Sequence, residues 1–476
     1  MSKKSRRNFL KKSTAVGAGF FIVPRNVLGG VGFISPSDQL NIASIGSGGK
    51  GADIQNSWAS KERIIALCDV HPNGKHGVIQ TRKKYPKAKF YIDFNELLDK
   101  EKDLDAVTIS TPDHTHGVIG NRAMNKGLHV YIQKPLTHNI EEARQLTITA
   151  KKNKVVTQMG NQGGSSIGVR KIQEWIDSKM IGKISKVYAW TNRPVWPQGF
   201  KMPEPSTSKP KDLEWDMWLG PAKYRGYRPE FHPFNWRGWW DYGTGALGDM
   251  GCHILDAPYK TLSLGYPKDV ECSVATIYEK MWNANYYPEG CPPASIVTLH
   301  FDKNSKTNSN IEMIWMDGGI IPPRPEIIPA EDYLGEKGNK NGAFIIGDKG
   351  VISCGVYGLN AKLYRKGEKV EHLNTNLIYN KNNNLDDIHH TEWIDACKGG
   401  YGSKAYKKLT SPIEYAGPFT ETVLMGNLAL RSYMIKDGKN FIGRKKLIWD
   451  GQNTRITNFD LANQFVGRDR RKGWGL

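Results

Sequence analysis

The sequence predicts an α/β protein in which a doubly wound parallel sheet is followed by an α+β domain with a mainly antiparallel sheet. From Leu40 to about residue 160, short apolar runs alternate with helical segments, which is typical of strand–helix–strand units. Beyond that point, longer apolar strands are separated by turn residues, which is typical of antiparallel pairing. The 476 residues leave room for two or three such domains.

Six short strands are expected in the first domain, residues 38–160. They lie at 41–47, 63–69, 89–93, 105–111, 129–133 and 155–161. Helical apolar spacing marks the segments between them at 94–100, 118–127 and 140–153. Strands joined by helices run in the same direction, so this order predicts a parallel sheet.

The second domain is expected at residues 161–435, with residues 436–476 as a tail packed on the domains. A helix at 168–182 opens it, and the pattern predicts helices again at 389–400 and 421–435. Strands are expected at 185–194, 270–280, 295–301, 310–319, 343–355 and 361–367. A stretch rich in Pro, Gly and Trp separates the first of these strands from the rest.

The chain begins MSKKSRRNFLKKSTAVGAGFFIVP, a basic stretch followed by a short apolar run. The run is shorter than the roughly 20 apolar residues of a membrane span, and this order is typical of a cleavable export signal. Arg6 and Arg7 precede Asn-Phe-Leu-Lys, which resembles the twin-arginine signal of bacteria. We therefore expect a signal peptide at residues 1–30, a periplasmic location and no membrane span in the mature chain. A disordered basic terminus is the alternative.

The formal net charge is +20, and the expected signal supplies +7 of it from Lys3, Lys4, Arg6, Arg7, Lys11, Lys12 and Arg25. The other basic residues are spread along the chain without zinc-finger spacing or a base-reading helix. We expect a solvated basic surface and no nucleic-acid partner, although an anionic substrate also fits the charge.

The cysteines are too widely spaced to suggest a metal ribbon or a redox pair. None of Cys68, Cys252, Cys272, Cys291, Cys354 and Cys397 forms a C-x-x-C motif. An exported location permits disulfides, but a chain of this length does not require them. We expect mostly free, buried thiols and no metal site.

A glycine-rich loop follows the first expected strand and has the G-x-G-x-x-G pattern. Its residues are Gly46, Ser47, Gly48, Gly49, Lys50 and Gly51. In such loops the first glycine permits a tight turn, the second lets the backbone approach a pyrophosphate, and the third lets the helix pack on the strand. The helix N-terminus then faces the phosphates with its partial positive charge. The loop predicts a Rossmann-type dinucleotide site, with an ordinary glycine-rich turn as the alternative.

Asp69 ends the second expected strand, 23 residues after Gly46. A carboxylate there accepts hydrogen bonds from the adenosine ribose and repels a 2′-phosphate, so NAD is favoured over NADP. Lys50 could instead help an NADP phosphate, but His71-Pro72-Asn73 offers no arginine for one.

Three later segments, together with this loop, resemble the Gfo/Idh/MocA oxidoreductase family, in particular its exported bacterial branch. They are STPDHTH at 110–116, HVYIQKPL at 129–136 and GDMGCHILD at 248–256. The resemblance runs from about residue 38 to residue 476. It implies a nicotinamide-binding domain and a second domain with a large open sheet that forms a dimer or tetramer interface.

The resemblance also implies a set of site residues. The family's lysine falls on Lys134, and its D-x-x-x-H pair falls on Asp249 and His253. In the family the Thr111-Pro112 segment borders the nicotinamide, and we expect His116, at the same crevice, among the cofactor-binding residues. Gln133 stands where the family usually has glutamate, and its amide can still bond the nicotinamide ribose. His114 and His116 could each be a second acid/base, a metal ligand or a surface residue.

The chemistry of these residue types agrees with that resemblance. Lys134 follows a strand of the parallel sheet, where ligands bind in such folds. Asp249 and His253 are four residues apart, so on a helix they share a face. Oxidation of an alcohol needs a base for the hydroxyl proton, and His253 can serve with Asp249 orienting its ring. Lys134 can donate a hydrogen bond to the substrate oxygen.

Seven of the fourteen tryptophans lie between residues 190 and 240. Flat amphipathic rings suit the apolar faces of sugars, so we consider Trp196 and Trp239 as substrate-binding residues, with His232 and Arg237 adding polar contacts. A core or an oligomer interface is an equal alternative for the tryptophans.

Export and a dinucleotide site together restrict the function. The twin-arginine route carries folded proteins, so a cofactor can leave the cytoplasm bound. The first hypothesis is a dehydrogenase that oxidises a sugar, glycoside or cyclitol with a tightly held NAD. The second is an NAD-assisted glycoside hydrolase or lyase, in which oxidation, elimination, water addition and re-reduction leave no net redox change. His116, His232 and Tyr242 are candidates for its second base. The third is a non-catalytic sugar-binding protein with structural NAD.

Overall fold

The computed structural model describes residues 38–52, 62–74, 76–375, 378–379 and 384–476. Residues 40–476 form one compact unit. The expected signal at residues 1–30 lies outside the described residues. Among the helices that are described, none has the length and apolar character needed to cross a membrane.

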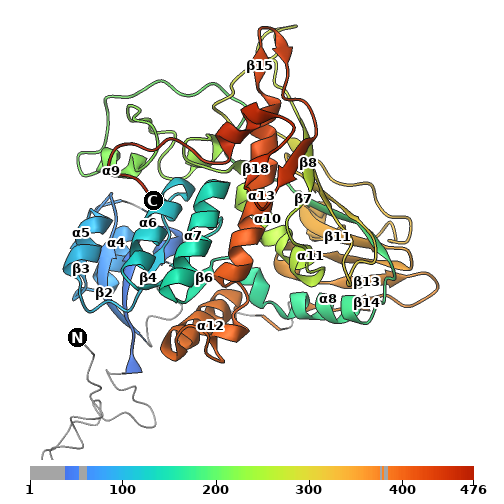
Figure 1. Cartoon of the computed structure of the whole chain (residues 1–476), viewed down its shortest axis with the longest axis horizontal. Helices are drawn as coiled ribbons and strands as arrows, with labels where there is room; N and C mark the ends of the chain where they lie inside the picture. Colours follow the sequence, from blue (N-terminus) through green and yellow to red (C-terminus); the bar gives the residue numbers. More distant parts are fainter. Residues whose placement is uncertain (1–37, 53–61, 75, 376–377, 380–383) are drawn as a thin grey trace, which may run out of the picture. The chain divides into compact units, whose positions relative to one another are not determined.

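In the described part of the first domain, six parallel strands pair in the order β3-β2-β1-β4-β5-β6 (Figure 1). They are β1 Asn41–Ile45, β2 Arg63–Cys68, β3 Lys89–Tyr91, β4 Ala106–Ile109, β5 His129–Ile132 and β6 Thr157–Met159. The helices between them are α4 Val78–Lys84, α5 Phe94–Lys100, α6 Asp113–Asn125 and α7 Ile140–Asn153. This arrangement confirms the predicted doubly wound parallel sheet.

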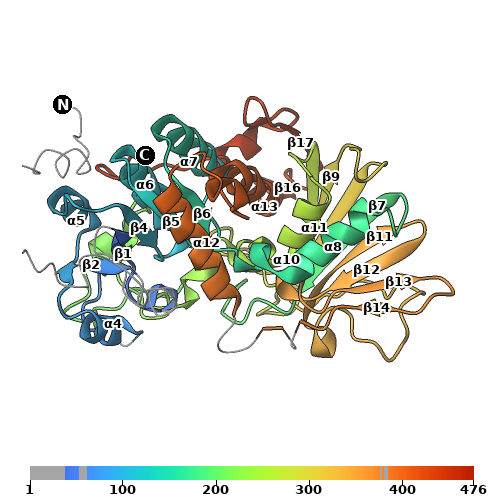
Figure 2. The same ribbon diagram turned by 90° about the horizontal axis from the view of Figure 1, so that it is seen from below.

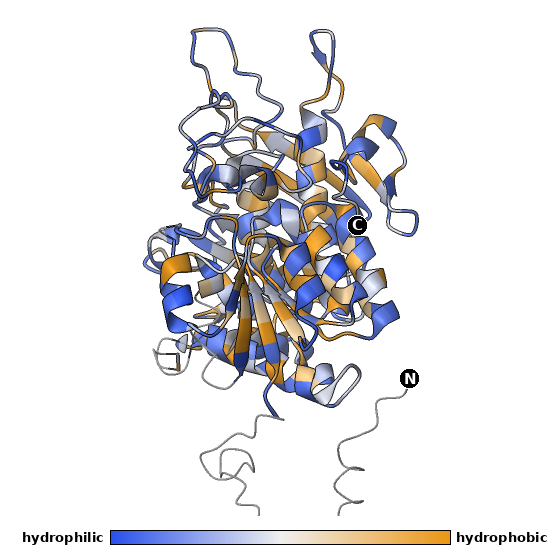
Figure 3. Ribbon diagram, turned by 90° about the vertical axis from the view of Figure 1, so that its left-hand side faces the viewer, coloured by the Kyte–Doolittle hydropathy of each residue, from blue (hydrophilic) through white to orange (hydrophobic). Residues whose placement is uncertain are grey.

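The central strands β1, β4 and β5 are buried along nearly their whole length, which explains why they are mainly apolar (Figure 3). On one face, Val107 and Ile109 belong to the same apolar cluster as Val118 of α6 and Leu146 of α7. On the other face, Tyr131 of β5 belongs to a second cluster that includes several residues of α12, Leu385–Gly399. A helix from far along the chain therefore covers this part of the first sheet.

The second sheet has ten strands within the described residues, in the order β14-β13-β12-β11-β7-β10-β9-β8-β17-β18. Its first strands are β7 Ile184–Thr191, β8 Asp269–Val274, β9 Ser295–Phe301, β10 Ile311–Met316 and β11 Asn341–Gly347. The others are β12 Gly350–Cys354, β13 Lys362–Arg365, β14 Glu371–His372, β17 Leu447–Asp450 and β18 Arg455–Ile456. All neighbours pair antiparallel except β7 and β10, so the predicted mainly antiparallel sheet is confirmed. The single expected strand at 343–355 is two strands joined by a turn.

Helices lie against one face of this large sheet (Figure 2). They include α8 Ile167–Asp177, α10 Gly245–Ile254, α11 Asp256–Thr261 and α13 Ile413–Tyr433. Helix α13 contacts α7 of the first domain as well as β8, β9 and α10, so it joins the two sheets into one unit. The remaining short elements include α9 Trp215–Leu219, η3 Asn235–Gly238, β15 Lys436–Asp437 and β16 Asn440–Phe441. All six cysteines are free, and all but Cys272 are buried.

Candidate active site

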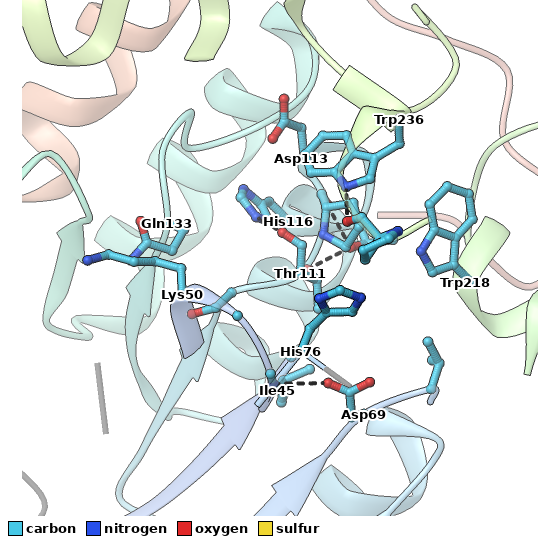
Figure 4. Close-up of a pocket in the computed structure, with 18 of the residues that line it drawn as sticks. Ile45, Lys50, Asp69, His76, Thr111, Asp113, His116, Gln133, Trp218 and Trp236 are labelled. Atoms are coloured by element: carbon cyan, nitrogen blue, oxygen red, sulfur yellow. Dashed lines mark hydrogen bonds between the residues drawn. The ribbon is translucent and has the colours of Figure 1, made fainter. Parts of the chain in front are cut away.

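A cavity of about 670 Å³ opens along the carboxyl ends of the parallel strands. Its wall includes most of the expected cofactor residues, the expected lysine after β5 and the expected histidine of the second domain. Of the expected site residues, those that line it are Gly46, Gly48, Gly49, Lys50, Asp69, Thr111, Pro112, His116, Gln133, Lys134, His232, Arg237 and His253. Figure 4 shows Lys50 and Gln133 on one side of the cavity and Trp218 and Trp236 on the other.

The glycine loop has the close contacts that require glycine. Gly46 has a φ of +79°, and a Cβ there would lie 2.8 Å from the carbonyl oxygen of Ser110. A Cβ on Gly51 would lie 1.9 Å from the carbonyl oxygen of Gly46, so only glycine lets the next helix start directly on the strand. Gly48 lines the cavity, and a Cβ there would lie 2.8 Å from the His76 carbonyl oxygen.

Ser47 does not line the cavity, which corrects its assignment as a cofactor contact. Its side chain is fully buried. The hydroxyl donates toward the carbonyl oxygens of Ser44 and Cys68, at 3.1 and 3.0 Å. Ser47 therefore ties the glycine loop to the ends of the first two strands.

Asp69 lies at the end of β2 and faces the cavity (Figure 4). Its two carboxylate oxygens accept hydrogen bonds from the backbone N–H groups of Gly48 and His71, at 3.2 and 3.0 Å. Burial raises the pKa of Asp69, and these two hydrogen bonds oppose the rise. Lys50 turns toward α12, where its ammonium lies 3.2 Å from the Asp386 carboxylate.

The motif after β4 places His116 against the backbone. Its Nδ1 lies 2.8 Å from the Pro135 carbonyl oxygen and its Nε2 lies 2.7 Å from that of Thr111. Both ring nitrogens are therefore engaged, so a second acid/base or metal-ligand role is not supported. The His114 ring is fully buried and lies outside the cavity wall, which also removes its candidate roles.

Gln133 carries an unused donor at the edge of the cavity. It lines the wall, and its buried Nε2 has no hydrogen-bond partner among the described residues. A buried amide without a partner is costly, so a bound group that accepts its hydrogen bond would stabilise the site. This feature fits the expected contact with a nicotinamide ribose.

Lys134 forms the charged centre of the site. Its ammonium donates to Asp249 Oδ1 and to the Asp249 carbonyl oxygen, both at 2.8 Å. The same carboxylate oxygen lies 3.4 Å from Arg237 Nε. Burial disfavours the charged form of Asp249, but Lys134 and Arg237 outweigh it and lower the pKa to about 2. Asp249 is absent from the cavity wall, so it is not placed to touch substrate. Its carboxylate bonds Lys134 and not His253, whose Nδ1 has no partner among the described residues, so Asp249 positions the ammonium and does not orient the imidazole ring as expected.

His253 lies one helical turn after Asp249 on α10, as expected, and lines the cavity. Burial lowers its pKa well below 6.5, and the charge of Lys134 lowers it further. The ring is therefore neutral at physiological pH and can accept a proton. Its Nδ1 has no partner among the described residues, and its ring meets that of Tyr357 edge-on at 4.9 Å.

The tryptophan-rich segment forms mainly a core of its own. Trp239 packs with Phe231 at 4.7 Å and is absent from the cavity wall. Trp196 is also absent from it, and its indole N–H donates to Gln198. Both assignments as substrate-binding residues are corrected, because neighbouring aromatic and amide groups occupy these rings. Trp196 and Trp239 are better described as core residues, which was the alternative expectation.

His232 and Tyr242 each pack against other aromatic rings. His232 lies 5.2 Å from the ring of His71 and 6.2 Å from that of His76, which places it beside the residues that follow β2. A role for His232 next to the reacting part of a substrate is therefore not supported. The Tyr242 ring packs among His114, Trp218 and Phe231 and does not line the cavity.

Several residues of the cavity wall were not predicted from the sequence. They are Asp113, Gln162, Trp218, Trp236, Tyr357 and Trp474. Asp113 stands inside the STPDHTH motif and could have been selected as a carboxylate beside the crevice. Trp218 and Trp236 belong to the tryptophan-rich segment, but nothing in their spacing separates them from the core tryptophans. Tyr357 gave no signal because its segment reaches the cavity only in the folded chain. Trp474 ends the stretch ANQFVGRDRRKGW, which lies inside the family resemblance, but it was not singled out as a site residue.

Two family models match consecutive parts of the chain. Residues 40–161 match the model described as the oxidoreductase family, NAD-binding Rossmann fold. Residues 165–277 match the C-terminal alpha/beta domain of the same family. Both matches are to models of the Gfo/Idh/MocA oxidoreductase family, and together they cover residues 40–161 and 165–277. The resemblance read from the sequence motifs is thus confirmed at the level of the family and its NAD-binding fold.

Curated relatives of these domains cover part of the chain. A glycosyl hydrolase family 109 protein from Solibacter usitatus is 31% identical over 166 residues, which are 32% of this chain and 37% of that protein. An alpha-N-acetylgalactosaminidase from Shewanella oneidensis is 28% identical over 190 residues, 34% of this chain and 41% of the relative. The matches therefore span less than half the length of these relatives.

A solved structure with the same fold covers most of the chain. An inositol dehydrogenase homolog from Azotobacter vinelandii, in complex with NADH and myo-inositol, gives a TM-score of 0.52 at 17% identity. The likeness covers 81% of this chain and 93% of that one. At this identity the likeness concerns the fold, in which a Rossmann domain precedes a large sheet.

Proposed function

We propose that the protein holds NAD tightly and oxidises a secondary alcohol of a sugar, glycoside or cyclitol. The observation that carries the proposal is the Lys134–Asp249 pair at 2.8 Å beside a neutral His253, in the cavity that the glycine loop also lines. The glycine contacts and the unpartnered Gln133 amide fit a bound dinucleotide. An ammonium and an imidazole in one crevice fit the removal of a proton from an alcohol.

Each polar group of the site has a separate task in this reaction. A nicotinamide bound in this cavity would supply the acceptor for the hydride that leaves the alcohol carbon. His253 takes the hydroxyl proton on its neutral ring, and Lys134 donates a hydrogen bond to the oxygen as negative charge develops there. Asp249 holds the ammonium in place through two 2.8 Å contacts. Arg237 adds a second positive charge at the same carboxylate.

NAD is the preferred cofactor in this proposal. The Asp69 carboxylate faces the cavity at the end of β2, where it would accept bonds from ribose hydroxyls and repel a 2′-phosphate. Among the described residues after β2, His71 lines the cavity, whereas Arg82, which donates to the Pro72 carbonyl oxygen at 3.2 Å, does not. We also propose that the protein is periplasmic and forms a homo-oligomer.

A second candidate is NAD-assisted cleavage of a glycoside. The similarity to a glycosyl hydrolase family 109 protein and to an alpha-N-acetylgalactosaminidase favours it. This reaction needs a second base for the C–H proton next to the transient ketone. Asp113 is suited to that task, because it lines the cavity and its charge interacts with Arg237 and Lys134. Its Oδ2 accepts a 2.6 Å hydrogen bond from Thr244.

Acid extraction of the purified protein tests both candidates. We expect about one NAD per chain. A panel of sugars and cyclitols, added without NAD, should then convert the bound cofactor to its reduced form, read at its near-ultraviolet absorbance. Aryl glycosides separate the two reactions, since phenol release without net reduction identifies cleavage. Ligand binding without turnover, unchanged in His253→Ala, would identify a non-catalytic sugar-binding protein and contradict both.

A further inference from the structure

Residues 467–476, here named the closing segment, run over the first domain and reach the cavity (Figure 1). Arg468 anchors the segment at its start. Its guanidinium lies 2.9 Å from the Glu142 carboxylate on α7 and also donates to the His114 carbonyl oxygen on α6. The Glu142 side chain is fully buried, so the pair is enclosed by protein. A buried pair of this kind fixes the position of the backbone that carries it.

Two further contacts hold the middle of the closing segment. Arg471 donates from Nε to the Gly220 carbonyl oxygen at 2.8 Å and from Nη2 to that of Asp216 at 2.7 Å. Arg122 of α6 donates to the Gly473 carbonyl oxygen at 2.6 Å. The segment therefore links α6 with the end of α9.

Trp474 is where the closing segment meets the cavity. Its ring lies 5.8 Å from the ring of Phe94, the first residue of α5, and both rings line the cavity. The Arg122 guanidinium lies 5.5 Å from the ring of Phe94 and 5.9 Å from that of Trp474. Ile92, just after β3, lines the same part of the wall. This part is aromatic and apolar, in contrast to the charged part around Lys134.

The strand order shows which half of a dinucleotide would meet this wall. The glycine loop follows β1, which lies between β2 and β4 in the sheet. A dinucleotide with its pyrophosphate at this loop directs one base toward β4 and β5 and the other toward β2 and β3. Lys134 follows β5, so the nicotinamide belongs on that side. The adenine then belongs on the side of Asp69 and Ile92.

We propose that Trp474 and Phe94 form the adenine-binding wall, and that the closing segment retains the dinucleotide. The inference rests on the proposed function, because it takes NAD as the ligand. Base–aromatic stacking supplies affinity that a flat apolar surface does not, and a segment held by three arginines closes the exit beside the base. An enzyme outside the cytoplasm depends on such retention, because it meets little free NAD.

A pair of substitutions at Trp474 tests the aromatic contact while keeping an apolar side chain against Phe94. Trp474→Leu removes the aromatic face, and Trp474→Phe keeps one. The readout is exchange of bound NAD for isotopically labelled NAD, followed by mass spectrometry of the extracted nucleotide. We expect Trp474→Leu to release NAD about 5- to 100-fold faster than the parent, and Trp474→Phe to stay within about threefold of it. Trp282→Leu, at a tryptophan with 89% exposure outside the cavity wall, is the matched control and should leave the rate unchanged.

Nicotinamide mononucleotide, which lacks adenine, separates a local effect from general damage. Its affinity for protein emptied of NAD should be the same for the parent and for Trp474→Leu. Equal NAD release rates in the two Trp474 variants, or equal losses for the mononucleotide and NAD, would overturn the inference. A parent protein that neither carries nor binds NAD would instead overturn the proposed function, and the inference with it.

Discussion

Asp249 Oδ1 lies between two cations, which explains how a buried carboxylate remains ionised. Lys134 Nζ is at 2.8 Å and Arg237 Nε is at 3.4 Å. Removing one partner from such a cluster leaves an uncompensated charge, so the three side chains act as a unit. The substrate oxygen would meet an ammonium that is already oriented, and little reorganisation is needed when charge develops.

Replacing Lys134 with methionine tests this arrangement with a side chain of similar length. The variant keeps the apolar stem and loses the donor, so we expect kcat to fall about 100- to 1000-fold, the range for loss of one preorganised donor. The measurement is reduction of bound NAD by the active compound of the sugar panel. Lys201→Met, in an exposed pair with Glu204, is the control and should keep the parental rate. Normal turnover in Lys134→Met would remove Lys134 from the mechanism.

The pH dependence of kcat/KM tests the role of His253. Burial and the neighbouring Lys134 keep its pKa well below 6.5, and only the neutral ring accepts a proton. We therefore expect a flat profile between pH 7.5 and about 6.5, with activity falling only at lower pH. Lys134→Met removes a charge that lowers this pKa, so the acid limb of its residual activity should move to higher pH.

His232 provides the control for that profile. Burial lowers its pKa to about 4, so its titration could imitate an acid limb. Because its ring lies with His71 and His76 rather than with Lys134, His232→Gln should leave the limb in place. A limb that disappears in this variant would assign the titration to His232 and contradict the role of His253.

At the residue scale, Lys134 and His253 were predictable from the sequence. Lys134 follows a strand of the parallel sheet, and His253 lies one helical turn after Asp249, so their positions alone place both side chains near the crevice. The tryptophans show the limit of that reasoning. Trp196 and Trp218 stand in the same segment, yet only Trp218 lines the cavity. Which of two rings is buried in a core depends on contacts with distant residues, and composition does not carry that information.

Elements with a strong local pattern were predictable to their ends. The ranges expected for α5, α7 and β9 agree with the observed Phe94–Lys100, Ile140–Asn153 and Ser295–Phe301. For α5 and α7, side chains of Asp93 and Asn139 cap the first turn, a local signal. Helix α13 starts eight residues before its expected start at 421. Pro418 lies inside it, and an internal proline normally argues against a helix.

The glycine loop joins element packing to cofactor binding, and Gly51→Ala tests that link. The added Cβ would lie 1.9 Å from the backbone oxygen of Gly46, which no side-chain movement relieves. We expect the free energy of unfolding to fall by about 1–3 kcal/mol and the NAD content to drop. Urea denaturation and acid extraction measure the two effects. Gly265→Ala is the matched control, since a Cβ there meets nothing within 4 Å. Parental NAD content in Gly51→Ala would contradict the loop's role.

At the scale of the whole molecule, a helix that comes late in the chain packs on the sheet of the first domain. Residues 385–399 stand in the second half of the sequence, so continuity along the chain predicts that they belong to the second domain. In the structure, Trp393 of this helix is fully buried and its ring lies 5.7 Å from that of Tyr131 on β5. Local periodicity predicts a helix here but does not state which sheet the helix covers.

This packing predicts that residues 40–161 will not fold alone. Without α12, the apolar face that includes Ile42, Tyr131 and Val156 loses its cover. Each large apolar side chain exposed costs about 1.5–3 kcal/mol, and a small domain has a total stability of only about 5–15 kcal/mol. We expect the isolated fragment to bind a hydrophobic dye and to lack a cooperative thermal transition, whereas residues 40–476 should unfold in one. In the full chain, Trp393→Ala should lower the free energy of unfolding by about 3–5 kcal/mol, because it opens a cavity beneath β5. A fragment with a sharp transition and native NAD binding would show instead that α12 is dispensable for the first domain.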